Sequence, residues 1–414
     1  MENKTTASGS RPRLLKQLNR ALVMRIIREQ GPKSRAELAR STGLSDPAVL
    51  KIVGGLINDR LLQEIGEGDS TGGRKPVMLD INPDGALAVG VDLTPEYIRA
   101  AIVRLDFSIA AEAAVSIDPA EGYAAILEHM RLLIEQVIRE SHANPHRIMG
   151  IGVAHPGVMS EQADRILLAS NLSSLENMPL AKDLERHFQL PVILEVDARA
   201  SALAEMWLGD ARGIANFLSV DIDVGLGSGL VLNGHIYRGV NGMAGEIGHM
   251  VVEPQGPDCA CGKKGCLETL VAFPAIVREA MRDPGPVLQA YCGEQASPVD
   301  IDCIIEAAKQ GDASAVESLR RSARALGMAL GNLLNVIDIS TIFINSKLAA
   351  LDELYLQEIR STLSHYFLLA NEMPIQVRPS SLGRKGEILG MAVLVMRPFF
   401  QADPESASIN TPSN

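Results

Sequence analysis

Aromatic residues and long apolar runs are both scarce in this sequence. Only 4% of its 414 residues are aromatic, with a single tryptophan, although 46% are hydrophobic, so any core must consist mainly of aliphatic side chains. No segment provides the roughly 20 consecutive apolar residues of a membrane span, and no secretory signal peptide precedes the chain. These absences predict a cytoplasmic protein, and its length predicts two or three domains.

Acidic residues outnumber basic ones overall, but not at the N-terminus. The net charge is −11, yet residues 1–85 carry 14 lysines and arginines against 10 acidic residues, a net of +4. The remaining residues therefore have a net charge of −15. A basic head on an acidic body predicts that the head, and not the body, binds a polyanion.

Residues 12–82 have the pattern of a winged helix-turn-helix that follows a polar, disordered arm over residues 1–11. Ser34 and Glu37 have the spacing of a capping box, Gly43 supplies a tight turn, and Pro47 stands near the start of the next helix. A short helix, a turn with glycine and a second short helix make this motif. The predicted elements are helices over 12–30, 35–42 and 46–58, and wing strands over 61–65 and 77–81.

The third helix of the head is expected to enter the major groove of DNA by its first turns. Each charged residue taken alone is more typical of a solvated surface, and a helix-turn-helix used only for protein contact remains the alternative. The expected DNA contacts are Asp46, Pro47, Ala48 and Lys51 at the bases, Arg35 near a phosphate, and Arg74 and Lys75 of the wing loop in a minor groove.

From residue 86 to residue 397 the sequence alternates strands with helices, and we expect a disordered tail over 398–414. The strand-rich pattern occurs twice, which predicts two α/β lobes with ligands at the carboxyl ends of strands in the cleft between them. The predicted strands are 87–92, 99–105, 109–117, 148–154, 192–195, 217–224, 229–232 and 341–345, and the predicted helices are 123–141, 180–188, 198–208, 298–310, 313–336, 351–367 and 389–396.

Three of the five cysteines lie within eight positions, in a C-x-C-G-x-x-G-C run. The glycines let the backbone turn sharply enough for Cys259, Cys261 and Cys266 to converge, and His249 can complete a tetrahedral Cys3His set. A disulfide or unrelated buried thiols are the alternatives. A structural Zn²⁺ is the prediction, because a reducing cytoplasm preserves metal thiolates. Cys292 and Cys303 lie outside the cluster.

Two glutamates flank the metal ligands. Glu246 is three residues before His249, and Glu268 is two residues after the last cysteine of the cluster. We expect the metal to brace a loop whose two carboxylates face a neighbouring polar ligand.

These motifs, A-G-E-I-G-H followed by C-x-C-G-x-x-G-C-L-E-T, resemble the ROK family of repressors, open reading frames and sugar kinases over about residues 14–397. The N-terminal motif resembles its repressor branch, which includes xylose- and N-acetylglucosamine-responsive regulators. The resemblance implies an actin-like ATPase-type fold in two lobes, a sugar in the cleft, one zinc per subunit, and a homodimer or tetramer.

The nucleotide side of this family's cleft is altered here. Family kinases cradle ATP phosphates with a D-x-G-G-T turn, whereas residues 92–96 read D-L-T-P-E, with Pro95 lacking an N–H and Glu96 adding a carboxylate. A later glycine pair is replaced by residues 343–347, F-I-N-S-K. The glycine run 225–229 survives, although such a run can also be a hairpin corner. The sequence therefore predicts that the protein is not an enzyme.

The sugar side matches the family better. By resemblance, Asp197 corresponds to the kinases' catalytic aspartate, and Glu246, His249 and Glu268 correspond to sugar-contacting positions, with Asn171 and Gly157 also bordering the pocket. Val196 replaces a family asparagine, so one polar contact is lost or replaced. A helix N-cap remains the alternative role for Asp197.

The sequence predicts a DNA-binding transcriptional regulator, a repressor of genes of carbohydrate metabolism or transport, that is controlled by a sugar bound in the body. An ATP-dependent sugar kinase with an appended DNA-binding domain is one alternative. A regulator controlled by a partner protein is the other.

Overall fold

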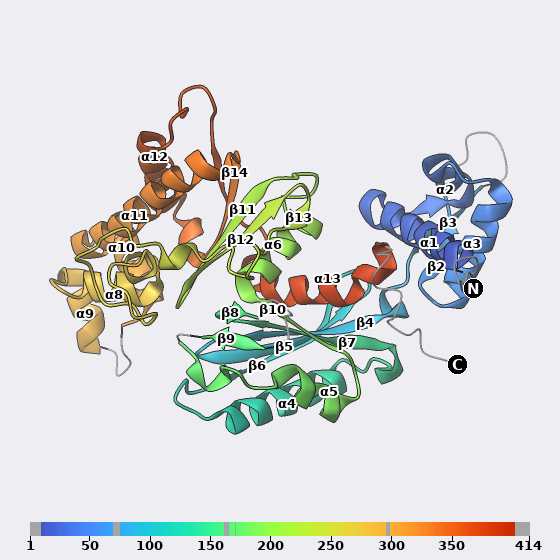
Figure 1. Cartoon of the computed structure of the whole chain (residues 1–414), viewed down its shortest axis with the longest axis horizontal. Helices are drawn as coiled ribbons and strands as arrows, with labels where there is room; N and C mark the ends of the chain where they lie inside the picture. The colour runs from blue at the N-terminus through green and yellow to red at the C-terminus, as the bar shows by residue number, and fades with distance from the viewer. Residues whose placement is uncertain (1–9, 69–74, 161–164, 170, 295–298, 402–414) are drawn as a thin grey trace, which may run out of the picture.

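The computed structural model describes residues 10–68, 75–160, 165–169, 171–294 and 299–401. Within these ranges the chain forms an N-terminal head and a body of two lobes, and the last helix, α13, points its C-terminal end toward the head (Figure 1). None of the helices in these ranges is long and apolar enough to cross a membrane.

The head is the predicted winged helix-turn-helix. The Ser34 side chain accepts a hydrogen bond from the Glu37 backbone, the Glu37 side chain accepts one from the Ser34 backbone, and Gly43 ends the second helix at a φ of 70°. The sequence pattern did not predict β1, which pairs with β3 and gives the wing three strands. The elements are α1 (Ser10–Gln30), β1 (Lys33–Ser34), α2 (Arg35–Thr42), α3 (Asp46–Asn58), β2 (Leu62–Glu67) and β3 (Val77–Ile81).

The first lobe is built on a five-stranded sheet in the order β10-β7-β4-β5-β6, in which β4, β7 and β10 are parallel. Helices α4 and α5 cover one face, and α6 and α13 lie on the other (Figure 1). Its elements are η1 (Pro83–Gly85), β4 (Leu87–Leu93), β5 (Tyr97–Arg104), β6 (Ile109–Ser116), α4 (Tyr123–Glu140), η2 (Pro145–Arg147), β7 (Ile148–His155), β8 (Val158–Met159), β9 (Ile166–Leu168), η3 (Ser173–Leu175), α5 (Leu180–Phe188), β10 (Val192–Val196) and α6 (Asp197–Trp207).

The second lobe repeats this topology. Its sheet has the order β13-β12-β11-β14-β15, with β11, β14 and β15 parallel and β12 and β13 antiparallel. Its elements are β11 (Phe217–Ile222), β12 (Leu226–Leu232), β13 (His235–Ile236), η4 (Ile247–His249), α7 (Glu268–Val271), α8 (Phe273–Ala280), α9 (Pro286–Glu294), α10 (Ile301–Lys309), α11 (Ala313–Ile337), β14 (Thr341–Asn345), η5 (Lys347–Ala350), η6 (Asp352–Leu356), α12 (Gln357–Tyr366) and β15 (Gln376–Pro379). The chain then returns to the first lobe through η7 (Gly383–Lys385) and α13 (Gly386–Phe400).

Among the predicted helices of the body, α12 and α13 differ most from their expected limits. Helix α13 begins at Gly386 and continues through Phe400, into the stretch predicted as a tail, because Phe400 is buried in a core that also contains side chains of α1. Helix α12 begins at Gln357 instead of residue 351, because the preceding residues form the π-helical turn η6.

Candidate functional site

A cleft lies between the lobes at the carboxyl ends of parallel strands from both sheets. It encloses a cavity of about 140 Å³. Asp92 enters it from β4, Gly157 from the turn after β7, and Asp223 from the turn after β11. This is the position at which α/β folds of this kind bind ligands.

The residues that the sequence predicted for sugar binding come together in this cleft, although they are dispersed over about 100 positions of the chain. They arrive from four different elements or loops, so only the fold brings them together. The apolar side chain of Val196 also lines the cleft. The predicted residues that line it are Asn171, Asp197, Glu246, His249 and Glu268.

Asp197 begins helix α6 at the floor of the cleft. Val196 is the N-cap, so the N-cap role considered for Asp197 is wrong, although Asp197 Oδ1 does accept a hydrogen bond from the Ala198 N–H at 2.6 Å. Burial raises the pKa of Asp197 to about 7, and the Ala198 hydrogen bond only partly opposes this. The carboxyl group can therefore exchange its proton near neutral pH.

Glu246 and Glu268 face the same cleft from the metal-ligand loop. Burial raises the pKa of Glu246 to about 7, and the neighbouring Glu268 charge adds to that shift. Glu268, the first residue of α7, accepts a hydrogen bond from the Leu226 N–H through Oε2 at 3.1 Å. Carboxylates held in this way are bidentate acceptors suited to vicinal hydroxyl groups.

The predicted metal ligands form one compact cluster. The candidate ligand atoms of His249, Cys259, Cys261 and Cys266 all lie within 4.8 Å of one another. His249 Nδ1 is 3.7 Å from Cys259 Sγ, while the ring itself also borders the cleft. Only glycine fits at position 265, because the φ of Gly265 is 65° and a Cβ there would come within 1.5 Å of the Glu253 carbonyl oxygen.

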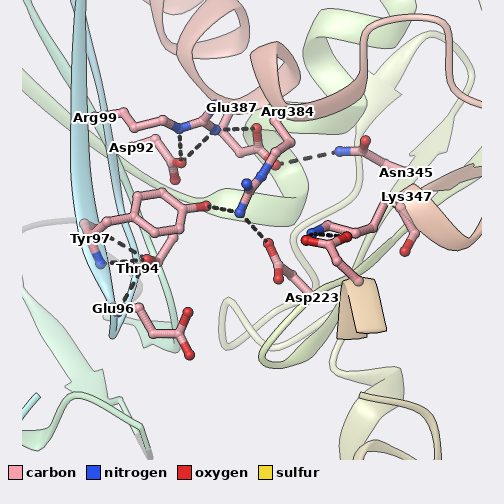
Figure 2. A network of polar contacts seen from close by, with 12 residues as sticks. Asp92, Thr94, Glu96, Tyr97, Arg99, Asp223, Asn345, Lys347, Arg384 and Glu387 are labelled. Carbon is pink, nitrogen blue, oxygen red and sulfur yellow. Dashed lines mark hydrogen bonds and ion pairs between the residues drawn. The ribbon is translucent and has the colours of Figure 1, made fainter. Parts of the chain in front are cut away.

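In the turn that follows β4, the backbone N–H groups donate hydrogen bonds to acceptors within the same turn (Figure 2). The Thr94 N–H donates to the Tyr97 carbonyl at 2.9 Å, and the Thr94 hydroxyl oxygen accepts from the N–H groups of Glu96 and Tyr97. Pro95 has no N–H. The turn therefore presents no free backbone donor to an anion in the cleft.

Figure 2 shows a buried acidic network beside that turn. Asp92 Oδ2 accepts hydrogen bonds from Arg99 at 3.1 and 2.8 Å, and Arg99 also approaches Glu387 Oε2 at 3.6 Å. Burial raises the pKa of Asp92, against the effect of Arg99, and raises that of Glu387 to about 8. Glu387 also accepts from Asn345 Nδ2 at 3.4 Å.

Arg384 links the two lobes across the mouth of the cleft (Figure 2). Its Nη2 donates to the Tyr97 hydroxyl of the first lobe at 3.2 Å and to Asp223 Oδ2 of the second lobe at 3.3 Å. The guanidinium also lies 5.2 Å from the Tyr97 ring centroid. Sequence reasoning missed this contact, because no local pattern relates residues so far apart in the chain.

The glycine run after β11 has a packing role. Gly229 lies so close to α6 that a Cβ there would come within 2.4 Å of the Ala202 Cβ, and a Cβ at Gly227 would come within 2.9 Å of the Ala198 Cβ. Gly225 ends the corner of the β11–β12 hairpin, whereas residues 226–229 belong to strand β12. The hairpin interpretation of the run therefore holds for Gly225.

The head presents part of the predicted DNA-binding set to solvent. Asp46, Pro47, Lys51 and Lys75 are exposed and Ala48 is half-buried. Arg35 forms an ion pair with Glu64 of the wing at 2.7 Å, and Arg74 lies outside the described residues. Sequence reasoning missed Leu50, which is 62% exposed on the same helix although its neighbours Val49 and Val53 are fully buried.

Comparison with known proteins identifies the family. A family model described as the ROK family matches residues 88–397. The chain belongs to the ROK family. Among its ROK relatives, the DNA-binding transcriptional dual regulator NagC of Escherichia coli (strain K12) is 32% identical over 389 residues, which are 93% of each chain. The putative xylose repressor of Caldicellulosiruptor sp. (strain Rt8B.4) is 29% identical over 385 residues, 92% of this chain and 96% of the relative.

Solved ROK structures share the fold. A ROK family transcriptional regulator homologous to E. coli MLC has a TM-score of 0.77 at 25% identity and covers 94% of this chain and 98% of its own. A ROK family glucokinase from Streptomyces griseus, in complex with glucose and AMPPNP, has a TM-score of 0.68 at 28% identity and covers 75% of this chain and 99% of its own. The predicted fold, a winged helix-turn-helix followed by a two-lobed ROK body, is confirmed.

Proposed function

We propose that this ROK protein is a DNA-binding repressor of genes of carbohydrate metabolism or transport, and that a sugar bound in its cleft controls it. The observation that carries the proposal is the combination of an exposed recognition helix with a cleft of carboxylates in one chain. The relatives named putative xylose repressor and N-acetylglucosamine repressor match over both parts of the chain. A repressor of this kind works in the cytoplasm, beside the chromosome.

The sugar is assigned to Asp197, Glu246, Glu268, His249 and Asn171. All five line one cavity, and three of them offer carboxylate oxygens to hydroxyl groups. Two of the carboxyl groups have a pKa of about 7, so a small change of surroundings sets whether they accept or donate a hydrogen bond. The Val196 side chain limits polar contact on one side of the sugar.

We assign a structural Zn²⁺ to His249, Cys259, Cys261 and Cys266. One imidazole nitrogen and three sulfurs within 4.8 Å of one another match the donor chemistry of a closed tetrahedral zinc site, with no open position for substrate. The ion would hold the loop between η4 and α7. His249 would then bind the ion through Nδ1 and leave its other ring nitrogen for the cleft.

Kinase chemistry is disfavoured by the turn after β4. ATP phosphates are usually held by free backbone N–H groups, and here those of Thr94, Glu96 and Tyr97 are used within the turn. Glu96 adds a negative charge beside it. A coupled assay that measures ADP release with a panel of sugars distinguishes the two functions. ATP turnover that depends on a sugar, and that the Asp197→Asn substitution abolishes, would establish the kinase alternative.

The DNA contacts are assigned to Asp46, Pro47, Ala48 and Lys51 of α3 at the bases, with Arg35 near a phosphate and the wing residues Arg74 and Lys75 in a minor groove. Two heads of a homodimer or tetramer would bind an inverted repeat whose half-sites are separated by whole helical turns, about 10.5 base pairs each. Both recognition helices then lie on the same side of the duplex.

The test uses the full-length protein and a duplex that it selects from a random pool. We expect binding in the nanomolar range at physiological salt, and release by D-xylose, N-acetylglucosamine or another sugar that raises the melting temperature of the protein. A protein that selects no duplex sequence would contradict the proposal. If the protein binds a selected duplex, and if a captured protein but no sugar changes the duplex affinity, the regulator is controlled by a partner protein.

A further inference from the structure

Two helices of the body both begin in the cleft and end at the head. Helix α6 begins with Asp197 and ends with Trp207, and α13 begins beside Glu387 and ends with Phe400. Their first turns therefore carry cleft carboxyl groups. At the other end, α13 packs against helix α1 of the head (Figure 1), and the Trp207 ring of α6 contacts Arg28 of α1.

The two helices are packed too closely to slide independently. A Cβ at Gly390 of α13 would come within 1.8 Å of the Ala200 carbonyl oxygen of α6, and one at Gly386 would come within 3.0 Å of Ser201 Oγ. The sheet below is equally close, since a Cβ at Gly90 would come within 2.6 Å of the Ile388 carbonyl oxygen. Interiors packed in this way transmit a displacement instead of absorbing it.

Trp207 at the end of α6 and Phe400 at the end of α13 meet Phe107 of the β5–β6 turn, and the three rings form an aromatic seat with centroids 5.8 to 6.3 Å apart. Arg28 of α1 rests on it. Its guanidinium carbon lies 4.0 Å from the Trp207 ring centroid and 5.5 Å from that of Phe400. A cation over the face of tryptophan is the strongest arrangement of this kind.

Arg28 is held to the body by this stacking more than by hydrogen bonds. Its side chain is only 15% exposed, and its one side-chain hydrogen bond among the described residues joins Nη2 to Glu29 of the same helix at 3.1 Å. Nη1 is buried and has no partner among these residues. The stacking therefore links the orientation of α1 to the positions of the ends of α6 and α13.

We propose that the α6–α13 pair carries the state of the cleft to the DNA-binding head, and that Arg28 on the aromatic seat is the positioning residue that makes this connection. The inference rests on the proposed function. A sugar that changes the contacts of Asp197 or the packing near Glu387 shifts the first turns, and the rigid pair moves the seat under Arg28. The head then favours one of two orientations, only one of which fits the duplex.

The test uses the single tryptophan of the chain, Trp207, whose ring contacts Arg28. In the full-length protein, the sugar that releases the selected duplex should shift the Trp207 emission or its quenching by acrylamide at the same sugar concentration. The probes are D-xylose, N-acetylglucosamine and that duplex. This measurement needs no variant, so a failure of a variant to fold does not affect it.

In the variant Arg28→Met, sugar binding in the cleft should no longer change DNA binding by the head. We expect it to keep its sugar affinity within about twofold, whereas the effect of sugar on duplex affinity falls from about tenfold or more to less than threefold. Arg25→Met is the matched control, since Arg25 is an exposed arginine of the same helix, and it should behave as the unaltered protein does.

The possible failures are distinguishable. Duplex release by sugar with an unchanged Trp207 signal, or full release in Arg28→Met, would overturn the inference and leave the proposed function standing. A protein that selects no duplex, or whose duplex binding responds to no sugar, would overturn the proposed function, and the inference would fall with it.

Discussion

The carboxyl groups of the cleft combine burial with access to a ligand. Asp197 and Glu246 have pKa values of about 7, above their ordinary values of 3.8 and 4.5. An acid whose pKa is raised on folding stabilises the folded state fully below its unfolded pKa, and this contribution is lost as the pH rises through the folded value. Both carboxyl groups therefore lower the free energy of unfolding at and above neutral pH, as is common for functional residues.

Asp197→Asn should consequently stabilise the protein while weakening sugar binding. We expect a melting temperature about 2 °C or more higher at pH 8, a smaller difference at pH 5, and sugar affinity lower by about tenfold. Thermal unfolding across this pH range and calorimetric sugar titration measure both effects. Glu372→Gln, which alters an exposed carboxylate, is the control, and an Asp197→Asn protein that is less stable at pH 8 would contradict the account.

The cysteine cluster makes a separate prediction. We expect native mass spectrometry to find one zinc per chain in the unaltered protein and none in Cys261→Ser, which should also unfold at a lower temperature, because binding of a structural metal contributes directly to folding free energy. Cys303→Ser, which lies outside the cluster, should retain one zinc per chain. Full zinc content in Cys261→Ser would show that this thiolate is not a ligand.

At the scale of elements, helix α3 joins a buried stripe to an exposed one. Val49, Val53 and Leu56 pack into the head, while Leu50 and Lys51 remain outside. An exposed leucine on a recognition helix is suited to contact a thymine methyl group, whereas a lysine suits a phosphate or a base edge.

We therefore expect Lys51→Ala and Leu50→Ala to have different effects. Lys51→Ala should weaken duplex binding and reduce its salt dependence, and Leu50→Ala should relax base preference at one position by about 1 to 3 kcal/mol. Binding titrations at several salt concentrations and a repeated selection measure these effects. Lys182→Ala, in the exposed lysine of α5, should change neither, and an unaltered salt slope in Lys51→Ala would remove Lys51 from the phosphate contacts.

At the scale of the whole molecule, one exposed polar contact between the lobes lies at the cleft mouth. Arg384 joins Tyr97 to Asp223, and its side chain is 55% exposed, so the link should contribute only a few tenths to about 1 kcal/mol. A link of this strength can hold a closed arrangement without preventing its opening.

Arg384→Met should shift the lobes toward the open arrangement. We expect a small increase in the radius of gyration by X-ray scattering, and a sugar affinity reduced by about two- to fivefold. Arg186→Met, which removes an exposed ion pair within α5, should leave both unchanged. A sugar affinity equal to that of the unaltered protein would show that the link does not control closure.

Short-range patterns of the sequence determined much of this protein. The capping box at Ser34, the left-handed turn at Gly43, and the spacing of three cysteines with two glycines each act within a few residues, so their geometry follows from local chemistry. The alternation of strands and helices likewise predicted two lobes with a cleft at the strand ends.

Only the tertiary structure decided which distant residues meet. Arg384 and Tyr97 are 287 positions apart, and Arg28 reaches a seat built by Trp207 and Phe400 from two other helices. Such contacts depend on the positions and angles at which whole helices and strands pack against one another. Close packing at glycine residues sets these positions, and with them the place where each helix ends. Local sequence signals contain no information on those crossings, so the link across the cleft and the joint between head and body appear only in the folded chain.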